Sequence, residues 1–508
     1  MSMRTVAGRP DHVVVVGAGL AGLAAALHLA GRGRAVTVLE RCAVPGGRAG
    51  RHDLDGYRMD TGPSVLTMPD IVRDTLAAVG ESLSDRLQLT RLDPAYRAHF
   101  ADGSVLGVRT DAEAMTETVR AFAGPGEAAG YQRLRDWLTR LYHVEYTRFI
   151  AANVDSPLGL LTPQLARLAA LGGFRRWDRA VGGFLRDERL RRVFTFQALY
   201  AGLSPQRALA LYAVIAYMDT VGGVYFPRGG MRALPDALAG AAADAGVTFR
   251  YDSTVSALER RGRCVTALHT TGGDRIGCDA VVLSCELGES YRLLSRTPRR
   301  PWPLRPAPSA VVLHLGVRGD WPGTAHHNLV FGHAWRTTFT DLIRDGRLMR
   351  DPSLLLTRPT ATDAQLAPPG RQLLSLLAPA PNLRQSRIDW DRAGPAYARE
   401  LLDVVAGRLP GLSGTVETLE IMTPADWGRL GLVAGTPFSL AHTFPQSGPF
   451  RPANLPGAVD NAVLAGCGTV PGVGIPTALL SGRLAADRIT GVRTGRARRI
   501  VDGAGRGR

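Results

Sequence analysis

The sequence predicts an α/β fold, and three consecutive features near the N-terminus support this prediction. Residues 13–16 are four valines, a β-branched run that is typical of a buried strand. They lead directly into a glycine-rich turn at residues 17–22. An alanine- and leucine-rich stretch at residues 23–30 then predicts a helix that stops at Gly31. Residues 36–39 predict a second strand. A strand, a turn, a helix and a strand in this order form a βαβ unit of Rossmann type.

The turn of this unit has the spacing of a dinucleotide site. Gly17, Gly19 and Gly22 fit the pattern G-x-G-x-x-G, with Ala18 between the first two. Small residues there let backbone N–H groups approach a pyrophosphate at the start of a helix. Glu40 follows Gly22 by 18 residues, at a position where a carboxylate binds a ribose diol and disfavours a 2′-phosphate. The alternatives are an alanine-rich buried hairpin and a signal peptide.

A second glycine turn favours a flavin over a nicotinamide cofactor. Pro45-Gly46-Gly47-Arg48 follows Glu40 closely, and residues 60–64 read Asp-Thr-Gly-Pro-Ser. A nicotinamide dinucleotide has no need of this second turn. A flavin dinucleotide is longer, and its ribityl and ring parts must be held beyond the first unit, so the sequence predicts FAD. The candidate contacts in this part of the chain are Arg41, Gly47, Arg48, Gly62 and Ser64.

Residues 13–64 resemble the amine-oxidase-like flavoproteins, and most closely their bacterial carotenoid (phytoene) desaturase branch. Four later segments match the family in the expected order, so the resemblance extends from about residue 13 to about residue 490. They are the Gly-Gly-Met turn at 222–231, a proline-rich turn at 362–370, the Q…FRP-x-N stretch at 446–454 and the C-terminal flavin loop at 465–476. The resemblance implies a two-domain flavoprotein. We expect its FAD to be non-covalent, because no His or Cys stands at an evident flavin-linking motif.

We expect three structural parts and a tail. A Rossmann-type FAD-binding domain is assembled from residues 10–95, 228–300 and 455–495. A helical insertion, a lid or membrane-docking element, spans residues 112–225, and a mixed-sheet substrate domain spans residues 300–455. Residues 491–508 contain six Arg and five Gly and predict a disordered tail.

The resemblance also implies contacts beyond the first two turns. Val255 supplies a backbone contact to adenine, and the C-terminal loop contributes Gly466, Cys467, Gly474 and Ile475. Relatives often carry Gly-Asp where this chain has Gly466-Cys467. A thiol is a weak acceptor for ribityl hydroxyls, so Cys467 is expected to act through its backbone N–H. A helix that begins near Ile475 would direct its positive end at negative charge on a reduced flavin. The alternative is that the loop only holds the ribityl chain.

Composition excludes several classes of protein. Of the 508 residues, 45% are hydrophobic and 21% charged, which excludes a largely disordered chain. The net charge is +16 and all 61 basic residues are Arg, which favours an acidic surface, either nucleic acid or anionic lipid. The five cysteines are odd in number and show no C-x-x-C spacing, which indicates a reducing compartment and no disulfide framework. The adjacent His326 and His327 are expected in a surface loop, and no metal site is predicted.

Three long segments lack Asp, Glu and Arg, namely residues 13–31, 430–450 and 461–481. The βαβ unit explains the first. The other two contain prolines that a regular helix in lipid does not accommodate. The sequence therefore predicts neither a transmembrane helix nor a signal peptide.

The insertion suggests contact with a membrane surface. Four apolar residues share one helical face and four arginines surround them; they are Leu134, Leu138, Leu141 and Val144, with Arg133, Arg135, Arg140 and Arg148. A second apolar stretch, residues 158–171, is followed by Arg175, Arg176 and Trp177. Basic amphipathic surfaces with aromatic residues suit anionic headgroups. The alternative is a lid helix that packs on the protein's own core.

The function that the resemblance implies is an FAD-dependent carotenoid desaturase, with phytoene as the favoured substrate and lycopene as the favoured product. A C40 hydrocarbon requires an apolar tunnel, and its partition into lipid favours a cytoplasmic, peripherally membrane-associated enzyme. No Ser-His-Asp order, carboxylate pair or metal cluster indicates hydrolysis, and no catalytic side chain is predicted. The alternatives are a carotenoid isomerase, ketolase or amine oxidase on the same fold, and a basic nucleic-acid-binding protein. The sequence does not indicate an oligomeric state.

Overall fold

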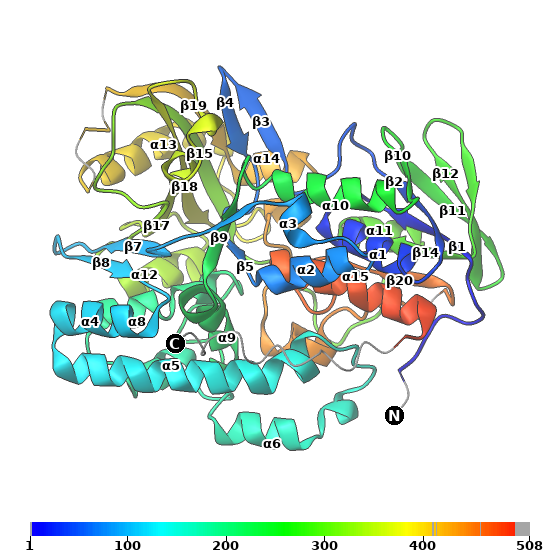
Figure 1. Cartoon of the computed structure of the whole chain (residues 1–508), viewed down its shortest axis with the longest axis horizontal. Helices are drawn as coiled ribbons and strands as arrows, with labels where there is room; N and C mark the ends of the chain where they lie inside the picture. The colour runs from blue at the N-terminus through cyan, green and yellow to red at the C-terminus, as the bar shows by residue number, and fades with distance from the viewer. Residues whose placement is uncertain (1–2, 409–410, 413, 458, 493–508) are drawn as a thin grey trace.

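A computed structural model describes residues 3–408, 411–412, 414–457 and 459–492 (Figure 1). The predicted tail at 491–508 therefore lies almost wholly outside the described residues. Within the described ranges, no helix combines the length and the apolar composition needed to cross a membrane.

A five-stranded parallel sheet forms the core of the first domain, in the order β10-β2-β1-β14-β20. Its strands are β1 (His12–Val16), β2 (Ala35–Leu39), β10 (Thr248–Arg250), β14 (Ala280–Leu283) and β20 (Ala462–Leu464). They come from three distant segments of the chain. The valines of β1 are all buried, and successive side chains point to opposite faces of the sheet. The sheet is therefore covered on both sides.

Helices cover one face of this sheet and a small sheet covers the other. Val13 and Val15 pack with the helical side, which includes α1 (Leu20–Ala30), α10 (Ala233–Asp244) and α15 (Ile475–Thr490). Val14 and Val16 pack against the antiparallel sheet on the other face. That sheet comprises β11 (Val255–Arg261), β12 (Cys264–Thr270) and β13 (Arg275–Gly277), with α11 (Leu287–Leu293) beside it.

The last helix packs very closely on the first. A Cβ added to Gly482 of α15 would lie 2.2 Å from the carbonyl oxygen of Ala21 in α1. The two helices are therefore fixed relative to each other and lie side by side (Figure 1).

A seven-stranded mixed sheet forms the second domain, in the order β19-β15-β18-β17-β16-β7-β8. Its strands are β7 (Tyr96–His99), β8 (Val105–Val108), β15 (Ser309–Arg318), β16 (His327–Val330), β17 (Leu354–Thr357), β18 (Arg371–Ala380) and β19 (Val416–Met422). The parallel pairing of β7 with β16 brings residues 96–108 into this sheet. The sheet thus extends beyond the predicted substrate domain, residues 300–455. Helices α12 (Trp335–Phe339), α13 (Trp390–Ala406) and α14 (Pro424–Arg429) accompany it.

Short elements join the two sheets. They are the hairpin β3 (Arg51–Leu54) and β4 (Tyr57–Asp60), the three-stranded sheet β5 (Leu66–Thr67), β9 (Val224–Pro227) and β6 (Leu89–Arg91), and the helices α2 (Pro69–Ala77) and α3 (Leu83–Arg86).

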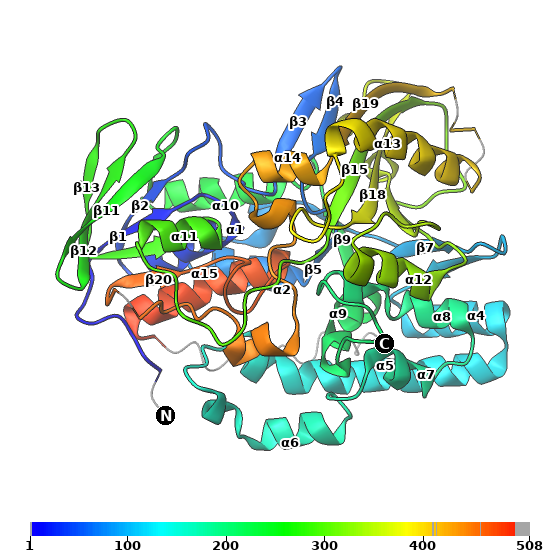
Figure 2. The ribbon, with the colours of Figure 1, turned by 180° about the vertical axis from the view of Figure 1, so that it is seen from behind.

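Residues 112–222 are helical, and their longest helix does not present its leucines outward. The helices are α4 (Ala112–Ala123), α5 (Pro125–Glu145), α6 (Pro163–Ala170), α7 (Trp177–Gly182), α8 (Glu188–Val193) and α9 (Val214–Tyr217). Leu134, Leu138 and Leu141 of α5 are buried in the core. The prediction that these leucines form a membrane-docking surface is therefore wrong. The alternative, a lid helix that packs on the protein's own core, describes α5. Helix α6 lies outside α5 in both views (Figures 1 and 2).

The surface-loop prediction for His326 and His327 is also wrong. Both side chains are buried at the start of β16, and each ring nitrogen Nδ1 shares a hydrogen bond with a threonine hydroxyl, 2.7 Å and 3.1 Å away. Burial lowers the pKa of His327 to about 3, so the ring is neutral. The two histidines are core residues of the second sheet.

Candidate cofactor-binding site

The carboxyl ends of β1, β2, β14 and β20 meet at one edge of the parallel sheet, where ligands bind in open α/β folds. Backbone hydrogen bonds tie the connecting segments together there. The N–H of Gly17 donates to Leu39, that of Ser284 to Val16, and that of Ala465 to Leu283. Four segments that are distant in sequence therefore share this edge.

In the first turn, the protein's own packing requires glycine at position 22 but not at position 19. A Cβ on Gly22 would lie 1.9 Å from the carbonyl oxygen of Gly17, so this glycine lets the turn close on the helix. A Cβ on Gly19 would find its nearest heavy atom 3.9 Å away, at Gly47. The protein's own packing does not require glycine at this position, and the free space beside Gly19 suits a ligand.

Unpaired donors face this free space. The N–H groups of Gly19 and Ala21 have no hydrogen-bond partner in the described part of the chain, and they lie at the start of the 11-residue helix α1. Backbone N–H groups and the positive end of the helix dipole together favour a phosphate group. This arrangement fits the pyrophosphate of FAD.

Glu40 ends β2 directly beside this turn. Its buried carboxylate accepts hydrogen bonds from the N–H groups of Ala18, at 2.6 Å, and Cys42, at 3.0 Å. A carboxylate has about four lone-pair sites, so two of them remain for a ribose diol. Ser253 donates its N–H to the Glu40 carbonyl oxygen, which brings the segment before β11 to the same place. Val255 begins β11 and is buried in one cluster with Leu39.

The second glycine turn binds to the first. The N–H of Gly46 donates to the carbonyl oxygen of Ala18, and a Cβ on Gly47 would lie 3.1 Å from the Cα of Gly19. Gly62 packs on the same turn, because a Cβ there would lie 1.8 Å from the carbonyl oxygen of Arg48. Ser64 follows in the half-buried segment that leads to β5. The two turns therefore form one continuous backbone surface.

Arg48 forms an ion pair with Glu286, a residue that the sequence analysis did not identify. The Nε of Arg48 and the Oε1 of Glu286 are buried and have no partner within the described residues. Two orphaned polar atoms at this edge fit the polar ribityl and phosphate part of a flavin dinucleotide. Glu286 follows the predicted strand at residues 281–283 by three residues, and this position at a strand's carboxyl end was the available signal.

The C-terminal loop completes the edge. Gly466 and Gly474 have φ of +108° and +127°, conformations that favour glycine. Gly474 is the N-cap of α15, and Ile475 is its first residue. The N–H groups of Cys467, Gly474 and Ile475 have no partner among the residues described, so they can donate hydrogen bonds to the acceptor atoms of a flavin ring. Gly466 itself donates to Ser481 Oγ at 3.0 Å, which fixes the loop to α15.

Arg41, one of the predicted cofactor contacts, binds another segment of the chain. The exposed side chain of Arg41 donates to the carbonyl oxygen of Leu430, at 3.2 Å, on the segment after α14. The structure thus brings together the turns that contain Gly17, Gly47 and Gly466, whereas the contact assigned to Arg41 stays a prediction.

Asp60 and Asp363 together join three of the segments matched in the sequence. Its carboxylate accepts the N–H groups of Met231, at 2.8 Å, and Arg232, at 3.1 Å, before α10. Asp363 accepts the N–H of Gly229 at 2.8 Å. Burial raises the pKa of Asp60 to about 6, although the backbone donors oppose this shift. The donors at the start of α10 are therefore occupied by the protein's own carboxylates.

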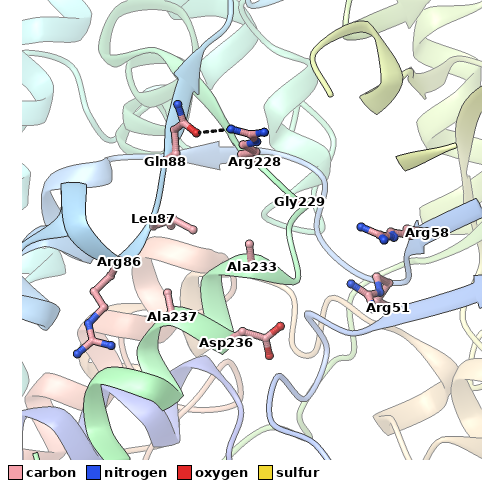
Figure 3. A pocket seen from close by; sticks show the side chains of 10 residues that line it. All are labelled: Arg51, Arg58, Arg86, Leu87, Gln88, Arg228, Gly229, Ala233, Asp236 and Ala237. Carbon is pink, nitrogen blue, oxygen red and sulfur yellow. Dashed lines mark hydrogen bonds between the residues drawn. The ribbon is translucent and has the colours of Figure 1, made fainter. Parts of the chain in front are cut away.

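A polar pocket of about 440 Å³ lies beyond this junction, and Figure 3 shows its lining. It is lined by Arg51, Arg58, Arg86, Leu87, Gln88, Arg228, Gly229, Ala233, Asp236 and Ala237. Arg86 pairs with Glu81 and Asp244, and Asp236 pairs with Arg232. Five of its ten lining residues are charged, and only Leu87, Ala233 and Ala237 offer apolar side chains, so this pocket is unsuited to a hydrocarbon.

A larger pocket, of about 840 Å³, includes in its lining His442, which packs on the C-terminal loop. Its lining is mostly apolar and includes Phe174, Leu203, Leu209, Leu304, Ile343, Ala441 and Phe444, with exposed arginines 176, 207, 305 and 384. His442 forms part of its wall and also touches the loop, because a Cβ on Gly472 would lie 2.2 Å from the ring. Burial lowers the pKa of His442 well below its usual range, so the ring is neutral. We call this cavity the apolar pocket.

A buried carboxylate between the insertion and the second sheet predicts a pH-dependent stability. Tyr96 Oη donates to Asp219 Oδ2 at 3.1 Å, and burial raises the pKa of Asp219 to about 7. The folded protein therefore holds a proton that the unfolded chain loses at about pH 4, and stability falls as the pH rises from about 4 to 7. We expect Asp219→Asn to remove this fall, which is worth roughly 4 kcal/mol at most.

The measurement is the melting temperature of wild type and Asp219→Asn from pH 5 to pH 8. The two curves should diverge as the pH rises, with the variant the more stable at pH 8. Asp236→Asn is the control, since that carboxylate is exposed. Parallel curves for wild type and Asp219→Asn would contradict the prediction.

Comparison with known proteins places the chain among flavoenzymes. A family model described as flavin containing amine oxidoreductase matches residues 20–490. The chain is 62% identical over 504 residues to a phytoene dehydrogenase of Streptomyces griseus, covering 99% of each protein. It is 36% identical to a zeta-carotene-forming phytoene desaturase of Myxococcus xanthus, over 94% of this chain and 93% of that protein.

A solved structure shares the fold. An oxidoreductase from Methanosarcina mazei matches with a TM-score of 0.61 and 16% identity, covering 93% of this chain and 99% of that one.

Proposed function

The chain belongs to the flavin containing amine oxidoreductase family, and we propose that within this family it desaturates a carotenoid precursor, converting phytoene to lycopene. Membership confirms the resemblance, the two-domain α/β flavoprotein fold and FAD as the cofactor. The protein is therefore an FAD-dependent oxidoreductase. The observation that supports a hydrocarbon substrate is the apolar pocket, whose lining includes His442, a residue that packs on the loop that would hold the flavin ring.

Different residues of the chain would bind different parts of the cofactor. The N–H groups of Gly19 and Ala21 would bind the pyrophosphate, Glu40 the ribose, and the loop from Gly466 to Ile475 the ring end. Bound FAD would supply the hydride acceptor for removal of hydrogen from an allylic carbon. The protein would orient the substrate and exclude water from the reacting carbons.

The apolar pocket suits a substrate that offers neither charge nor hydrogen bonds. Leu203, Leu209 and Ile343 give it an apolar wall, and the neutral His442 adds no charge. A charged group left unpaired in such a wall would be costly, whereas a polyene fills it by burial of apolar surface alone. We therefore place the substrate passage in this pocket, with His442 beside the flavin loop.

Exposed apolar side chains near the pocket support docking to a membrane surface. Phe174 and Phe444 line the pocket and are 43% and 58% exposed. Leu158 and Leu161, just before α6, are 66% and 71% exposed. Exposed arginines surround the pocket, and an anionic leaflet attracts them. We propose a peripheral enzyme on the cytoplasmic leaflet, docked by this face rather than by the leucines of α5.

Replacing Leu158 and Leu161 by serine should weaken vesicle binding at least tenfold. Each leucine that enters the bilayer interface gains about 1–2 kcal/mol from burial, and 1.4 kcal/mol corresponds to tenfold. Co-sedimentation with neutral phosphatidylcholine vesicles and with vesicles that also contain phosphatidylglycerol measures the effect. The matched control is Leu419→Ser with Leu430→Ser, two leucines that are also exposed, at 43% and 50%. Equal losses in both pairs, or no loss in the first, would reject this docking face.

The proposed reaction is tested by expression in cells that accumulate phytoene, followed by extraction and identification of the pigment. Lycopene supports the proposal in full. Zeta-carotene, the product in the name of the Myxococcus xanthus relative, would keep the desaturation and correct the product. Unchanged phytoene with a flavin-loaded protein would favour another reaction on the same fold, namely isomerisation, ketolation or amine oxidation.

A further inference from the structure

A buried cation lies behind the C-terminal loop. Arg451 follows the short segment 448–450, and the whole residue is only 1% exposed. Its guanidinium donates to the carbonyl oxygens of Cys467 at 2.6 Å and Thr469 at 2.9 Å. Longer bonds of 3.4 Å reach the carbonyl oxygens of Leu440 and Gln446. All of these acceptors are backbone carbonyls.

The charge of Arg451 has no counter-ion within the residues that the structure describes. Arg48, the other arginine at this edge, pairs with Glu286, whereas Arg451 forms no ion pair with a described carboxylate. Burial lowers the pKa of Arg451 to about 10, which still leaves the guanidinium protonated at neutral pH. A buried and unpaired charge is costly, so a negative charge supplied by a ligand would stabilise it.

The charge of Arg451 acts on the opposite side of the loop by polarising two of its peptides. The carbonyl groups of Cys467 and Thr469 point at Arg451, and the peptides that follow them are trans. In a trans peptide the N–H points opposite to the carbonyl. The N–H groups of Gly468 and Val470 therefore face away from Arg451, and neither has a partner in the described chain. A cation on the carbonyl side polarises such a peptide and strengthens its N–H as a donor.

We propose that Arg451 is a positioning residue that, through the peptides 467–468 and 469–470, stabilises negative charge on the reduced flavin and so raises its reduction potential. The inference rests on the proposed function, in which the substrate carbon gives the flavin a hydride, two electrons and one proton, and a second hydrogen leaves the neighbouring carbon as a proton that passes to water. The flavin then has one negative charge more than in its oxidised form. Arg451 touches neither substrate nor flavin in this scheme.

The test measures the reduction potential of bound FAD in wild type, Arg451→Lys and Arg451→Gln. Lysine keeps the charge, and glutamine keeps donors for the carbonyls without it. We expect Arg451→Gln to lower the ratio of reduced to oxidised flavin at least tenfold at a given potential, about 30 mV for a two-electron couple. Arg451→Lys should stay within a few-fold of wild type.

The control is Arg192→Gln. Arg192 is also buried and donates to the carbonyl oxygens of Gly332 and His333, but it lies in α8 and pairs with Glu188. This variant should lower stability without changing the flavin potential. Flavin occupancy and melting temperature are recorded for every variant, so a loss of binding is separated from a change in potential.

Several outcomes would overturn the inference. If Arg451→Gln loses flavin while the remaining flavin keeps its reduction potential, Arg451 only stabilises the structure of the loop. If Arg451→Lys and Arg451→Gln lower the potential equally, the charge is not the cause. If neither variant folds, the wild type provides the test. The proposal requires its bound FAD to have a higher reduction potential than free FAD, and an equal or lower potential would overturn it. Failure of the proposed function would appear separately, as unchanged phytoene with a normal flavin potential.

Discussion

Gly19→Val is expected to abolish FAD binding while the protein stays folded. Gly19 has φ −73° and ψ 172°, extended angles that valine adopts without strain. A Cβ there would have no heavy atom of the protein within 3.9 Å. The methyl groups would instead fill the space in front of the unpaired N–H groups of Gly19 and Ala21, where the pyrophosphate belongs. We expect at least hundredfold weaker binding, about 2.7 kcal/mol, with a melting temperature of the flavin-free protein changed by less than about 2 °C.

Gly22→Ala makes the contrast. Its Cβ would lie 1.9 Å from the carbonyl oxygen of Gly17, so backbone must move and stability should fall by about 1–3 kcal/mol. Flavin content is read from the visible absorbance of purified protein, and stability from thermal unfolding without FAD. The assignment fails if Gly19→Val keeps its flavin, or if both variants lower the melting temperature equally.

Leu203→Trp should cut pigment formation at least a hundredfold while FAD content stays normal. Leu203 is a half-buried residue of the apolar pocket, which His442 also lines. Tryptophan narrows the passage without adding charge, and a C40 chain then no longer fits through it. The cofactor site lies beyond His442, so its occupancy should not change. Product formed per bound flavin, in cells that make phytoene, is the measurement.

The matched control fills the other cavity. Ala237→Trp adds the same side chain to the arginine-lined pocket of Figure 3, also at a half-buried position. This variant should retain wild-type product per flavin. If Ala237→Trp loses as much activity as Leu203→Trp, or if Leu203→Trp is fully active, the substrate does not pass through the apolar pocket.

Much of the cofactor site was predictable because its signals are local. The strand at residues 13–16, the turn at 17–22 and the helix after it depend on the order of β-branched, glycine and alanine residues within about 30 positions. Glu40 was predictable for the same reason, since βαβ geometry sets its distance from Gly22. The structure places all of these at one sheet edge.

Partners that meet across long distances in sequence were not predictable. Glu286 pairs with Arg48 although 238 positions separate them, and a carboxylate after a strand can face many partners. Strands β7 and β8 join the second sheet across the whole helical insertion, because their pairing depends on where β16 lies in space. Arg451 could be matched to a motif, but its missing counter-ion is visible only once the surrounding residues are placed.

By itself the sequence determined the class of fold, the family and the two glycine-rich ends of the FAD site, because backbone conformation and spacing at those positions are properties of short segments. Only the tertiary structure decided which apolar faces are covered. Leu138 and Leu161 are equally apolar, yet the first lies on the buried face of α5 and the second is exposed. His326 and His327 likewise became core residues through the strands packed on them. Periodicity shows that a face is apolar, but burial depends on which surface the rest of the chain brings against it.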